Sequence, residues 1–265
     1  MSTLARIRTY PIKALDPLDL ETARITDVGG LEYDRRYAIV DDDGEYVNGK
    51  RTAAAHRLRS EYDPETELLT LRIQDRDEPH QFHLQRDRSA LEAWLSDYFD
   101  LSVQLEERTG GAQTDSGTGW GPTIISTATL ETVADWHDID LEETRRRFRP
   151  NLEVEGVEAF WEDRLFAGED EAVRFRIGDV EFEGRGPVPR CVVPTRNSYT
   201  GETDEGFQST FVERREATIP DWVDRSQFDH FFMLMTLTRI PEAERGKRLA
   251  VGDRIERLEI VDAPV

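Results

Sequence analysis

Short apolar runs separated by turn-forming residues constrain the fold of the first hundred residues more than any other feature of this sequence. Turn signals stand at residues 41–44 (Asp-Asp-Asp-Gly) and 63–66 (Asp-Pro-Glu-Thr). We therefore predict strands at residues 4–10, 20–28, 37–40, 68–73 and 81–84. At residues 89–99 the apolar period becomes helical, so one amphipathic helix is expected to close a barrel-like or sandwich-like section.

A glycine-rich segment at residues 108–122 divides the sequence into two sections. A loop of this length is either a linker or a functional loop, and we place it between a β-barrel-like domain at 1–107 and a second domain at 123–265. In the second domain we expect one helix capped by Thr127, and another that begins with a capping box of Asp140 and Glu143 and ends at Phe148. Strands are predicted at 123–126, 152–154, 173–177, 180–183, 191–195, 228–237 and 255–260. The predicted fold class is mostly β with a few helices (α+β).

The net charge of the chain makes some classes of binding partner unfavourable. Asp and Glu outnumber Lys and Arg by 55 to 34, which gives a formal net charge of -21 and disfavours nucleic-acid binding. Only Lys13, Lys50 and Lys247 are lysines, and this acidic, arginine-rich composition resembles that of halophile proteins, whose self-repulsion molar salt screens. No run approaches the roughly 18 apolar residues of a membrane span. The first residues lack the apolar core of a signal peptide, so we expect a soluble, cytoplasmic protein that binds no membrane.

The only cysteine, Cys191, lies at the predicted start of a strand, in the segment 187–196 (Pro-Val-Pro-Arg-Cys-Val-Val-Pro-Thr-Arg). A thiolate is a suitable ligand for a transition metal, and the nearby Arg185, Arg190 and Arg196 favour the thiolate form. The alternative is a buried cysteine that acts as a small apolar side chain. One cysteine forms no intramolecular disulfide and cannot alone hold an iron-sulfur cluster, so electrons for a redox reaction would come from another protein.

Basic residues at strand and helix ends form the second group of candidates. Residues 145–149 read Arg-Arg-Arg-Phe-Arg and are followed by Pro150 and Asn151; guanidinium groups suit phosphate oxygens, and the Asn151 amide can bond a heterocycle or a phosphate. The alternative for residues 145–147 is that they cap the helix and pair with its glutamates. Lys13 and Arg35 stand at predicted strand ends, where solvation alone explains a charged residue.

Taken together and in this order, these motifs resemble the MOSC superfamily, named for the C-terminal domain of molybdenum cofactor sulfurase. The first section resembles its N-terminal β-barrel domain through residues 10–13 (Tyr-Pro-Ile-Lys) and 30–37 (Gly-Leu-Glu-Tyr-Asp-Arg-Arg-Tyr). The second resembles the MOSC domain, also a β-barrel, through 148–151 (Phe-Arg-Pro-Asn), 177–180 (Ile-Gly-Asp-Val) and 189–191 (Pro-Arg-Cys). Within the superfamily the similarity is greatest to the mitochondrial amidoxime-reducing component and its prokaryotic relatives.

The resemblance implies a molybdenum cofactor (Mo-molybdopterin), with Cys191 as metal ligand and catalytic residue. It places the following residues around the pterin and its phosphate: Lys13, Arg35, Arg149, Asn151 and Arg190. It also implies a reductase of small N-hydroxylated or N-oxide substrates, with a ferredoxin or flavoprotein as the external electron donor. Two alternatives stay open, a sulfur or cofactor carrier without turnover and a scaffold that binds no cofactor. Ala14 and the region of Gly119 and Trp120 depart from the family pattern, since relatives have hydroxyl side chains there.

Overall fold

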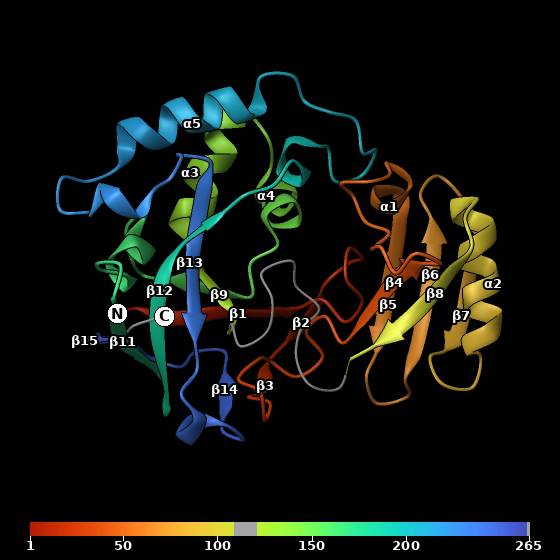
Figure 1. The fold of residues 1–265 in the computed structure, drawn as a ribbon, viewed down its shortest axis with the longest axis horizontal. Helices are drawn as coiled ribbons and strands as arrows, with labels where there is room; N and C mark the ends of the chain where they lie inside the picture. The colour runs from red at the N-terminus through yellow and green to blue at the C-terminus, as the bar shows by residue number, and fades with distance from the viewer. Residues whose placement is uncertain (109–120, 264–265) are drawn as a thin grey trace.

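The structure is a computed structural model that describes residues 1–108 and 121–263. Within these ranges the chain forms a large part, built on an eight-stranded sheet, and a smaller part with a separate three-stranded sheet (Figure 1). Strands predominate, and five α-helices accompany them in the described ranges. The prediction of a mostly β fold with a few helices is confirmed.

The eight-stranded sheet has the order β15-β11-β12-β13-β9-β10-β1-β2. Its strands are β1 (Thr3–Thr9), β2 (Leu18–Leu20), β9 (Thr123–Ser126), β10 (Leu152–Glu155), β11 (Glu171–Ile177), β12 (Val180–Pro189), β13 (Met233–Arg239) and β15 (Ile255–Asp262). β1 pairs antiparallel with β10, and Leu4 lies opposite Val154. The first strand of the chain therefore belongs to the sheet that the second half builds. The predicted domain limits at 107 and 123 stay a prediction.

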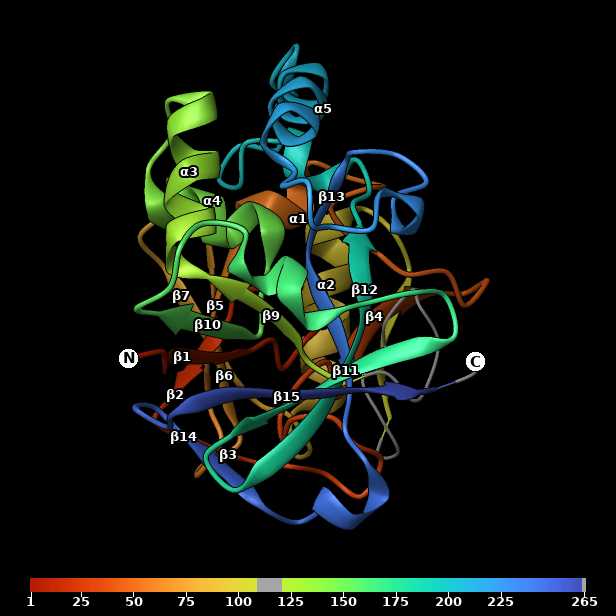
Figure 2. The same ribbon diagram turned by 90° about the vertical axis from the view of Figure 1, so that its left-hand side faces the viewer.

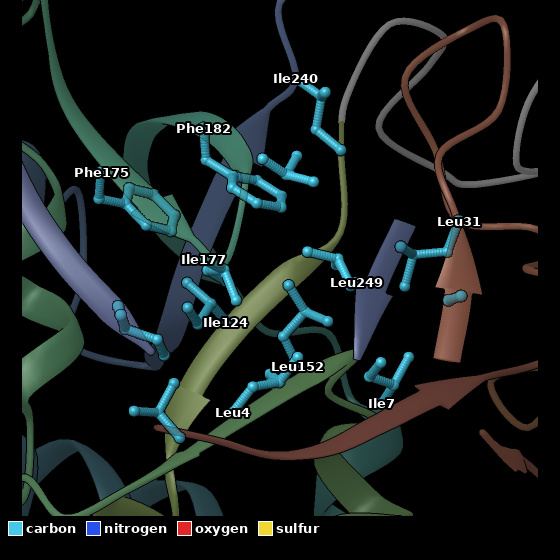
Figure 3. Packing of buried hydrophobic residues seen from close by; sticks show 14 of the residues in the cluster. Leu4, Ile7, Leu31, Ile124, Leu152, Phe175, Ile177, Phe182, Ile240 and Leu249 are labelled. Carbon is cyan, nitrogen blue, oxygen red and sulfur yellow. The ribbon is translucent and has the colours of Figure 1, made fainter. Parts of the chain in front are cut away.

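Apolar side chains from both halves of the chain fill one core beside this sheet (Figure 3). Leu4 and Ile7 of β1 pack there with Phe175 and Ile177 of β11 and with Phe182 of β12. Each of these side chains is fully buried, which stabilises the fold by about 1.5–3 kcal/mol per large apolar side chain. β14 (Arg248–Ala250) and β3 (Thr22–Arg24) pair beside this core, with Leu249 and Ala23 buried in it.

The smaller part has its own core. It contains β4 (Tyr37–Asp41) paired with β8 (Val103–Glu107), the meander of β5 (Leu58–Asp63), β6 (Leu68–Ile73) and β7 (Pro79–His83), and the helices α1 (Ala54–Arg57) and α2 (Arg88–Phe99). In Figure 1 these elements stand at the right, with α2 on the outside. Leu91 and Leu95 of α2 are buried in a cluster with Leu69 and Leu71 of β6. The predicted helix at 89–99 is confirmed.

Three helices cover the large part on one side: α3 (Thr127–His137), α4 (Leu141–Phe148) and α5 (Phe207–Thr218) (Figures 1 and 2). Ser126, one residue before the predicted cap, caps α3 by accepting a hydrogen bond from the Thr129 backbone. Asp140 caps α4 by accepting from the backbone N–H of Glu143, as predicted. Short 3-10 turns stand at Trp161–Leu165, Val193–Thr195, Arg225–Gln227 and Glu242–Glu244.

Several predicted elements are wrong. Residues 191–195 form no strand, because Pro189 ends β12 and Pro194 opens a 3-10 turn. β13 begins at Met233, five residues after the start of the strand predicted at 228–237. The strand predicted at 20–28 is not continuous, because β2 ends at Leu20 and β3 covers only Thr22–Arg24. β5, β8, β14 and α5 were not predicted. Within residues 1–108 and 121–263, no helix is long and apolar enough to cross a membrane.

Candidate functional site

One cavity of about 430 Å³ collects every residue that the sequence singled out as a cofactor ligand. These residues come from four separate stretches of the chain: Lys13, Arg35, Arg149, Asn151, Arg190 and Cys191. The smaller part contributes Asn48 to Arg59 to the wall, while β12 and β13 contribute residues such as Val188 and Met235. The cavity therefore lies where the two parts meet.

The wall of this cavity is positively charged, although the chain as a whole carries a formal charge of -21. Among the described residues that line it, nine are basic and two are carboxylates, Asp16 and Asp34. The basic residues are Lys13, Arg35, Lys50, Arg59, Arg146, Arg147, Arg149, Arg190 and Arg196. A concave, cationic wall in an acidic protein concentrates anions locally and indicates an anionic ligand.

Tyr10 lies between two of these arginines. The guanidinium carbons of Arg149 and Arg35 are 3.9 Å and 4.8 Å from the centroid of its ring, which is fully buried. Its hydroxyl donates to the backbone carbonyl of Pro150 at 3.1 Å. Arg35 and Arg149 both have left-handed backbones, with φ of 50° and 54°. Such conformations cost free energy in a non-glycine residue and cluster at functional sites, so the fold holds these two guanidinium groups in place at a cost.

Arg149 and Arg190 each have a buried guanidinium nitrogen without a hydrogen-bond acceptor among the described residues. Burial lowers the pKa of Arg149 to about 10, and its Nη2 atom is buried without a hydrogen-bond acceptor. Burial also lowers the pKa of Arg190, whose Nε atom has no acceptor. The Nη2 atom of Arg190 donates to the backbone carbonyl of Phe148 at 2.8 Å, which fixes the group beside Cys191. A buried guanidinium without an anion is unfavourable, and a bound anion would relieve that cost.

Cys191 follows the end of β12 and is partly exposed on the cavity wall. The backbone N–H of Arg190 donates to the carbonyl of Phe232 at 2.9 Å, so the segment is anchored immediately before the thiol. After it, the Thr195 hydroxyl donates to the Val192 carbonyl at 2.8 Å. This arrangement replaces the predicted strand, and it leaves the thiol at a turn beside the cavity rather than packed within a sheet. The alternative of a cysteine buried as an apolar side chain is wrong.

Asn151 is tied to the backbone. Its amide nitrogen donates to the carbonyl of Arg8 at 3.1 Å, and its side-chain oxygen accepts from the backbone N–H of Thr123 at 3.2 Å. These bonds link the ends of β1, β9 and β10, where Asn151 is buried. The side chain therefore shapes the wall of the cavity. Contact between Asn151 and a ligand stays a prediction.

Lys13 lies over the ring of Tyr46, with its Nζ atom 3.4 Å from the ring centroid. Its backbone N–H donates to the carbonyl of Tyr37 at 2.8 Å. The next residue, Ala14, lines the cavity with a φ of 73°, so the departure from the family pattern falls on the site itself. The other departure, at Gly119 and Trp120, lies outside the described residues.

The three arginines before Phe148 have different environments. Arg145 forms two hydrogen bonds with Glu153, and its Nη1 atom is 3.6 Å from Glu142. Arg147 pairs with Glu143 and with Asp204, in both cases at 2.6 Å. The alternative prediction was that these arginines pair with the glutamates of their own helix. Such pairs are observed for both, and each arginine also pairs with a carboxylate outside the helix.

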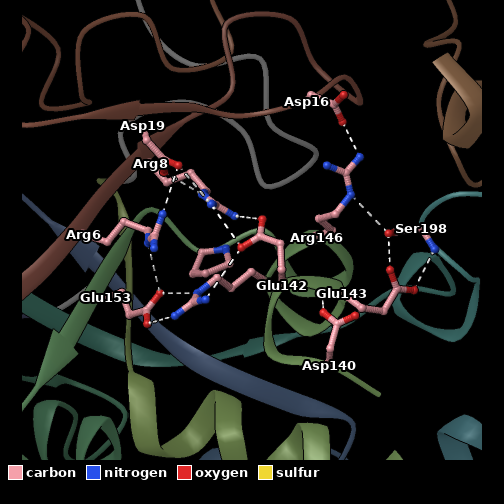
Figure 4. A network of polar contacts seen from close by, with 12 residues as sticks. Arg6, Arg8, Asp16, Asp19, Asp140, Glu142, Glu143, Arg146, Glu153 and Ser198 are labelled. Carbon is pink, nitrogen blue, oxygen red and sulfur yellow. Dashed lines mark hydrogen bonds and ion pairs between the residues drawn. The ribbon is translucent and has the colours of Figure 1, made fainter. Parts of the chain in front are cut away.

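Arg146 behaves differently from its neighbours. Its Nη2 atom pairs with Asp16 at 2.6 Å, and its Nε atom donates to the Ser198 hydroxyl at 3.3 Å. Figure 4 shows it extended between these two residues. Since Asp16 and Ser198 also line the cavity, Arg146 crosses from α4 to its wall.

The sequence analysis did not single out Arg59 or His56 as site residues. The Nη2 atom of Arg59 donates to the carbonyls of His56 and Ser198. His56 packs against Gly49, where an added Cβ would lie 2.4 Å from its Nε2 atom. The only local signal for them is a basic cluster at 50–59, since their contacts are made with residues far away in the sequence.

Fold and cavity define a β-rich protein whose two parts enclose an arginine-lined site with a cysteine on its wall. A family model described as the MOSC N-terminal beta barrel domain matches residues 1–138, and one described as the MOSC domain matches residues 123–256. The chain belongs to the MOSC-domain family and carries the N-terminal barrel domain of that family. MOSC domains are associated in general with molybdenum cofactor binding. Comparison with the curated proteins finds no match.

Proposed function

We propose that this cavity binds a molybdenum cofactor, with the Cys191 thiolate as the protein's ligand to the metal. The observation that supports this most directly is the position of the only cysteine on a wall with nine basic residues and two carboxylates. Thiolates suit transition metals, and neighbouring guanidinium groups favour the thiolate over the thiol.

The residues present fit such a group. A phosphate ester brings about two negative charges and several strong acceptors, which match guanidinium groups that lack acceptors. Arg149 and Arg190 each have a buried nitrogen without an acceptor, and both pKa values are lowered by burial. In this proposal the two arginines hold the anionic end of the cofactor, Arg35 and Lys13 add positive charge, and Asn151 keeps the wall in shape.

We further propose that the protein is an oxidoreductase that removes oxygen from small N-hydroxylated or N-oxide compounds. This part rests on the motifs shared with the amidoxime-reducing component. Breaking the N–O bond consumes two electrons and two protons, and the oxygen leaves as water. The bound cofactor supplies the two-electron chemistry, while the protein binds and orients the substrate and excludes bulk water.

The electrons come from a separate protein in this proposal. The sequence has a single cysteine, and an iron-sulfur cluster needs about four thiolates. A ferredoxin or a flavoprotein is the class of donor that fits. The donor must reach the cavity at the junction of the two parts, where Cys191 is partly exposed.

The test is elemental analysis for molybdenum on the chain purified in molar salt from a host that makes the cofactor. We expect near-stoichiometric molybdenum in the wild type and its loss in Cys191→Ala, together with loss of N-oxide reduction by a chemical reductant. Arg174→Gln, an exposed change in β11, serves as the matched control and should keep both. Full metal content in folded Cys191→Ala would contradict the ligand assignment. Metal without any reductase activity, with cyanide-releasable sulfur, would favour the carrier function.

A further inference from the structure

Six of the nine basic residues that line the cavity fall into two groups, each with a tyrosine beside it. The Tyr10 group consists of Arg35, Arg149 and Arg190, with Asp34 as its carboxylate; Arg35 pairs with Asp34 at 2.5 Å. Arg190 lines the same wall, and its Nη2 atom donates to the carbonyl of Phe148, the residue before Arg149. This is the group assigned above to the cofactor.

The Tyr199 group consists of Arg59, Arg146 and Arg196, with Asp16 as its carboxylate. The guanidinium carbons of Arg146 and Arg59 lie 4.8 Å and 5.5 Å from the centroid of the Tyr199 ring. Both also pair with Asp16, at 2.6 Å and 3.4 Å (Figure 4 shows the Arg146 pair). The group joins β5, α4 and the loop after Cys191, so it exists only where the two parts of the protein meet.

Arg196 enters this group from the same loop as Tyr199. Its Nη1 atom donates to the carbonyl of Gly201 at 3.1 Å, and its charge acts on His56, whose carbonyl accepts from Arg59. The loop is held close to the smaller part, because a Cβ on Gly201 would lie 2.8 Å from Ala53. The position of Arg196 is therefore set by backbone contacts and not by a carboxylate.

The positive charge of the Tyr199 group is only partly paired. Asp16 pairs with Arg59 and Arg146, and its second oxygen accepts from the Ser60 backbone at 3.0 Å, while Arg196 has no ion pair among the described residues. Within the described part of the chain, the Nε atoms of Arg59 and Arg196 are buried without hydrogen-bond acceptors. The side chains of Arg59 and Arg146 are only 23% and 15% exposed, so water solvates them poorly.

One phosphate ester cannot reach the acceptor-free nitrogens of both groups at once. A phosphate ester brings about two negative charges, and the Tyr10 group alone has three guanidinium groups and one carboxylate, Asp34. A single phosphate at the Tyr10 group leaves the buried Nε atoms of Arg59 and Arg196 without an acceptor among the described residues. Guanidinium groups bind carboxylates through two parallel hydrogen bonds, and such pairs discriminate strongly when partly buried.

We propose that the Tyr199 group is a second anion subsite that binds a carboxylate of the substrate, so that the protein prefers acidic N-oxides to neutral ones. The subsite rests on the residues just described. Only the statement that the bound acid is a substrate depends on the proposed function.

The test compares two ligands of nearly equal size, nicotinic acid N-oxide and nicotinamide N-oxide, by calorimetric titration of the full chain in molar KCl. The chain is prepared both free of cofactor and loaded with it. We expect the acid to bind about tenfold more tightly than the amide in both preparations, which corresponds to about 1.4 kcal/mol. Arg59→Gln should remove the preference while leaving molybdenum content unchanged. Arg174→Gln, far from the cavity, should keep the preference.

Three results would overturn the subsite. Equal binding of acid and amide to the cofactor-free chain would show that the group does not select carboxylates. A preference that disappears on loading, or molybdenum lost in Arg59→Gln, would assign the group to the cofactor. If Arg59→Gln fails to fold, Arg146→Gln gives the same readout from the other part of the protein. Failure of the proposed function would be seen separately, as absence of molybdenum from the wild type. In that case the titration of the cofactor-free chain still shows whether the Tyr199 group selects carboxylates.

Discussion

Arg147 and Arg149 stand two positions apart at the end of α4, yet their guanidinium groups have opposite environments. Arg147 pairs with Glu143 and Asp204 and donates to the carbonyl of Pro194. Arg149 faces the cavity, stacks on Tyr10 and has a buried nitrogen without an acceptor. Both residues come from one basic run in the sequence. The first charge forms a structural ion pair, and the proposed function assigns the second to a bound anion.

The backbone explains how neighbouring arginines are separated in this way. Arg147 lies within the helix, four residues after Glu143, at the spacing where side chains meet on one helix face. Arg149 is the C-cap, and its φ of 54° turns the chain away from the helix axis toward Pro150. Its N–H bonds the carbonyl of Arg145. A change of backbone conformation at one residue thus divides a structural ion pair from a candidate binding group.

The largest predicted effect on stability comes from replacing Arg147, the arginine whose charge is paired. Arg147→Met leaves Glu143 buried without its cation, so we expect a loss of about 3–5 kcal/mol in the free energy of unfolding. Chemical denaturation in molar KCl measures this. Arg174→Met, which removes partly exposed pairs with Glu181 and Glu259, is the matched control and should change stability by less than about 1 kcal/mol. A loss as small as that of the control would mean that Arg147 is not a structural ion pair.

Glu162 is a second buried group whose surroundings do not fully compensate its charge. Glu162 is 1% exposed, its Oε1 atom has no hydrogen-bond partner, and burial together with the charge of Asp163 raises its pKa from 4.5 to about 7. The folded state therefore keeps a proton that the unfolded chain loses. The stability that this proton contributes is present below pH 4.5 and is lost as the pH rises through about 7.

The variant Glu162→Gln should remove this dependence. Relative to wild type, its free energy of unfolding should rise between pH 4.5 and 7 by an amount on the order of 3 kcal/mol. His137 acts in the opposite direction, since burial lowers its pKa from 6.5 to about 4, and its contribution is lost as the pH falls. His137→Gln should therefore show the opposite slope against wild type. Parallel curves for all three proteins, from denaturation at a series of pH values, would refute both assignments.

The smallest predicted effect is that of salt concentration on the contribution of the buried pair of Arg147 and Glu143. Moving from molar to about 0.1 M KCl lengthens the Debye length from about 3 to about 10 Å, so repulsion among the surface carboxylates grows and the whole protein should lose stability. The penalty of Arg147→Met should nonetheless change by less than about 1 kcal/mol, because buried charges are little screened. Denaturation of both proteins at the two salt concentrations measures this. A penalty that follows the salt concentration would place the pair in solvent.

The sequence predicted local features well. The cap of α4 by Asp140 and the amphipathic helix at 89–99 depend on residues close in the chain, and both are observed. The strand at Cys191 was wrong because the apolar run suggested a strand, while Pro189 and Pro194 prevented it. α5 was missed although Phe207, Phe211 and Arg215 recur at four-residue spacing; its largely charged surface hid that signal.

The candidate site was predicted through the resemblance rather than through the physical properties of the residues. No spacing relates Lys13 or Arg35 to Cys191, which meet only because β1 joins the sheet of the second half. The Tyr199 group was missed for the same reason: Arg59 meets Arg146 through Asp16, across two parts of the chain. Charge balance is a property of the folded cavity, and the total of -21 gave no indication of it.

The most direct test of this account is the free energy of unfolding of Arg149→Met, measured on the chain with and without cofactor in molar KCl. Without cofactor, removal of an uncompensated buried charge should leave stability unchanged or raise it by about 1–2 kcal/mol. After growth in a cofactor-producing host, the variant should contain little molybdenum and lack the stabilisation that the ligand gives to the wild type. A loss of stability in the cofactor-free variant as large as that of Arg147→Met, or full molybdenum content, would contradict the account.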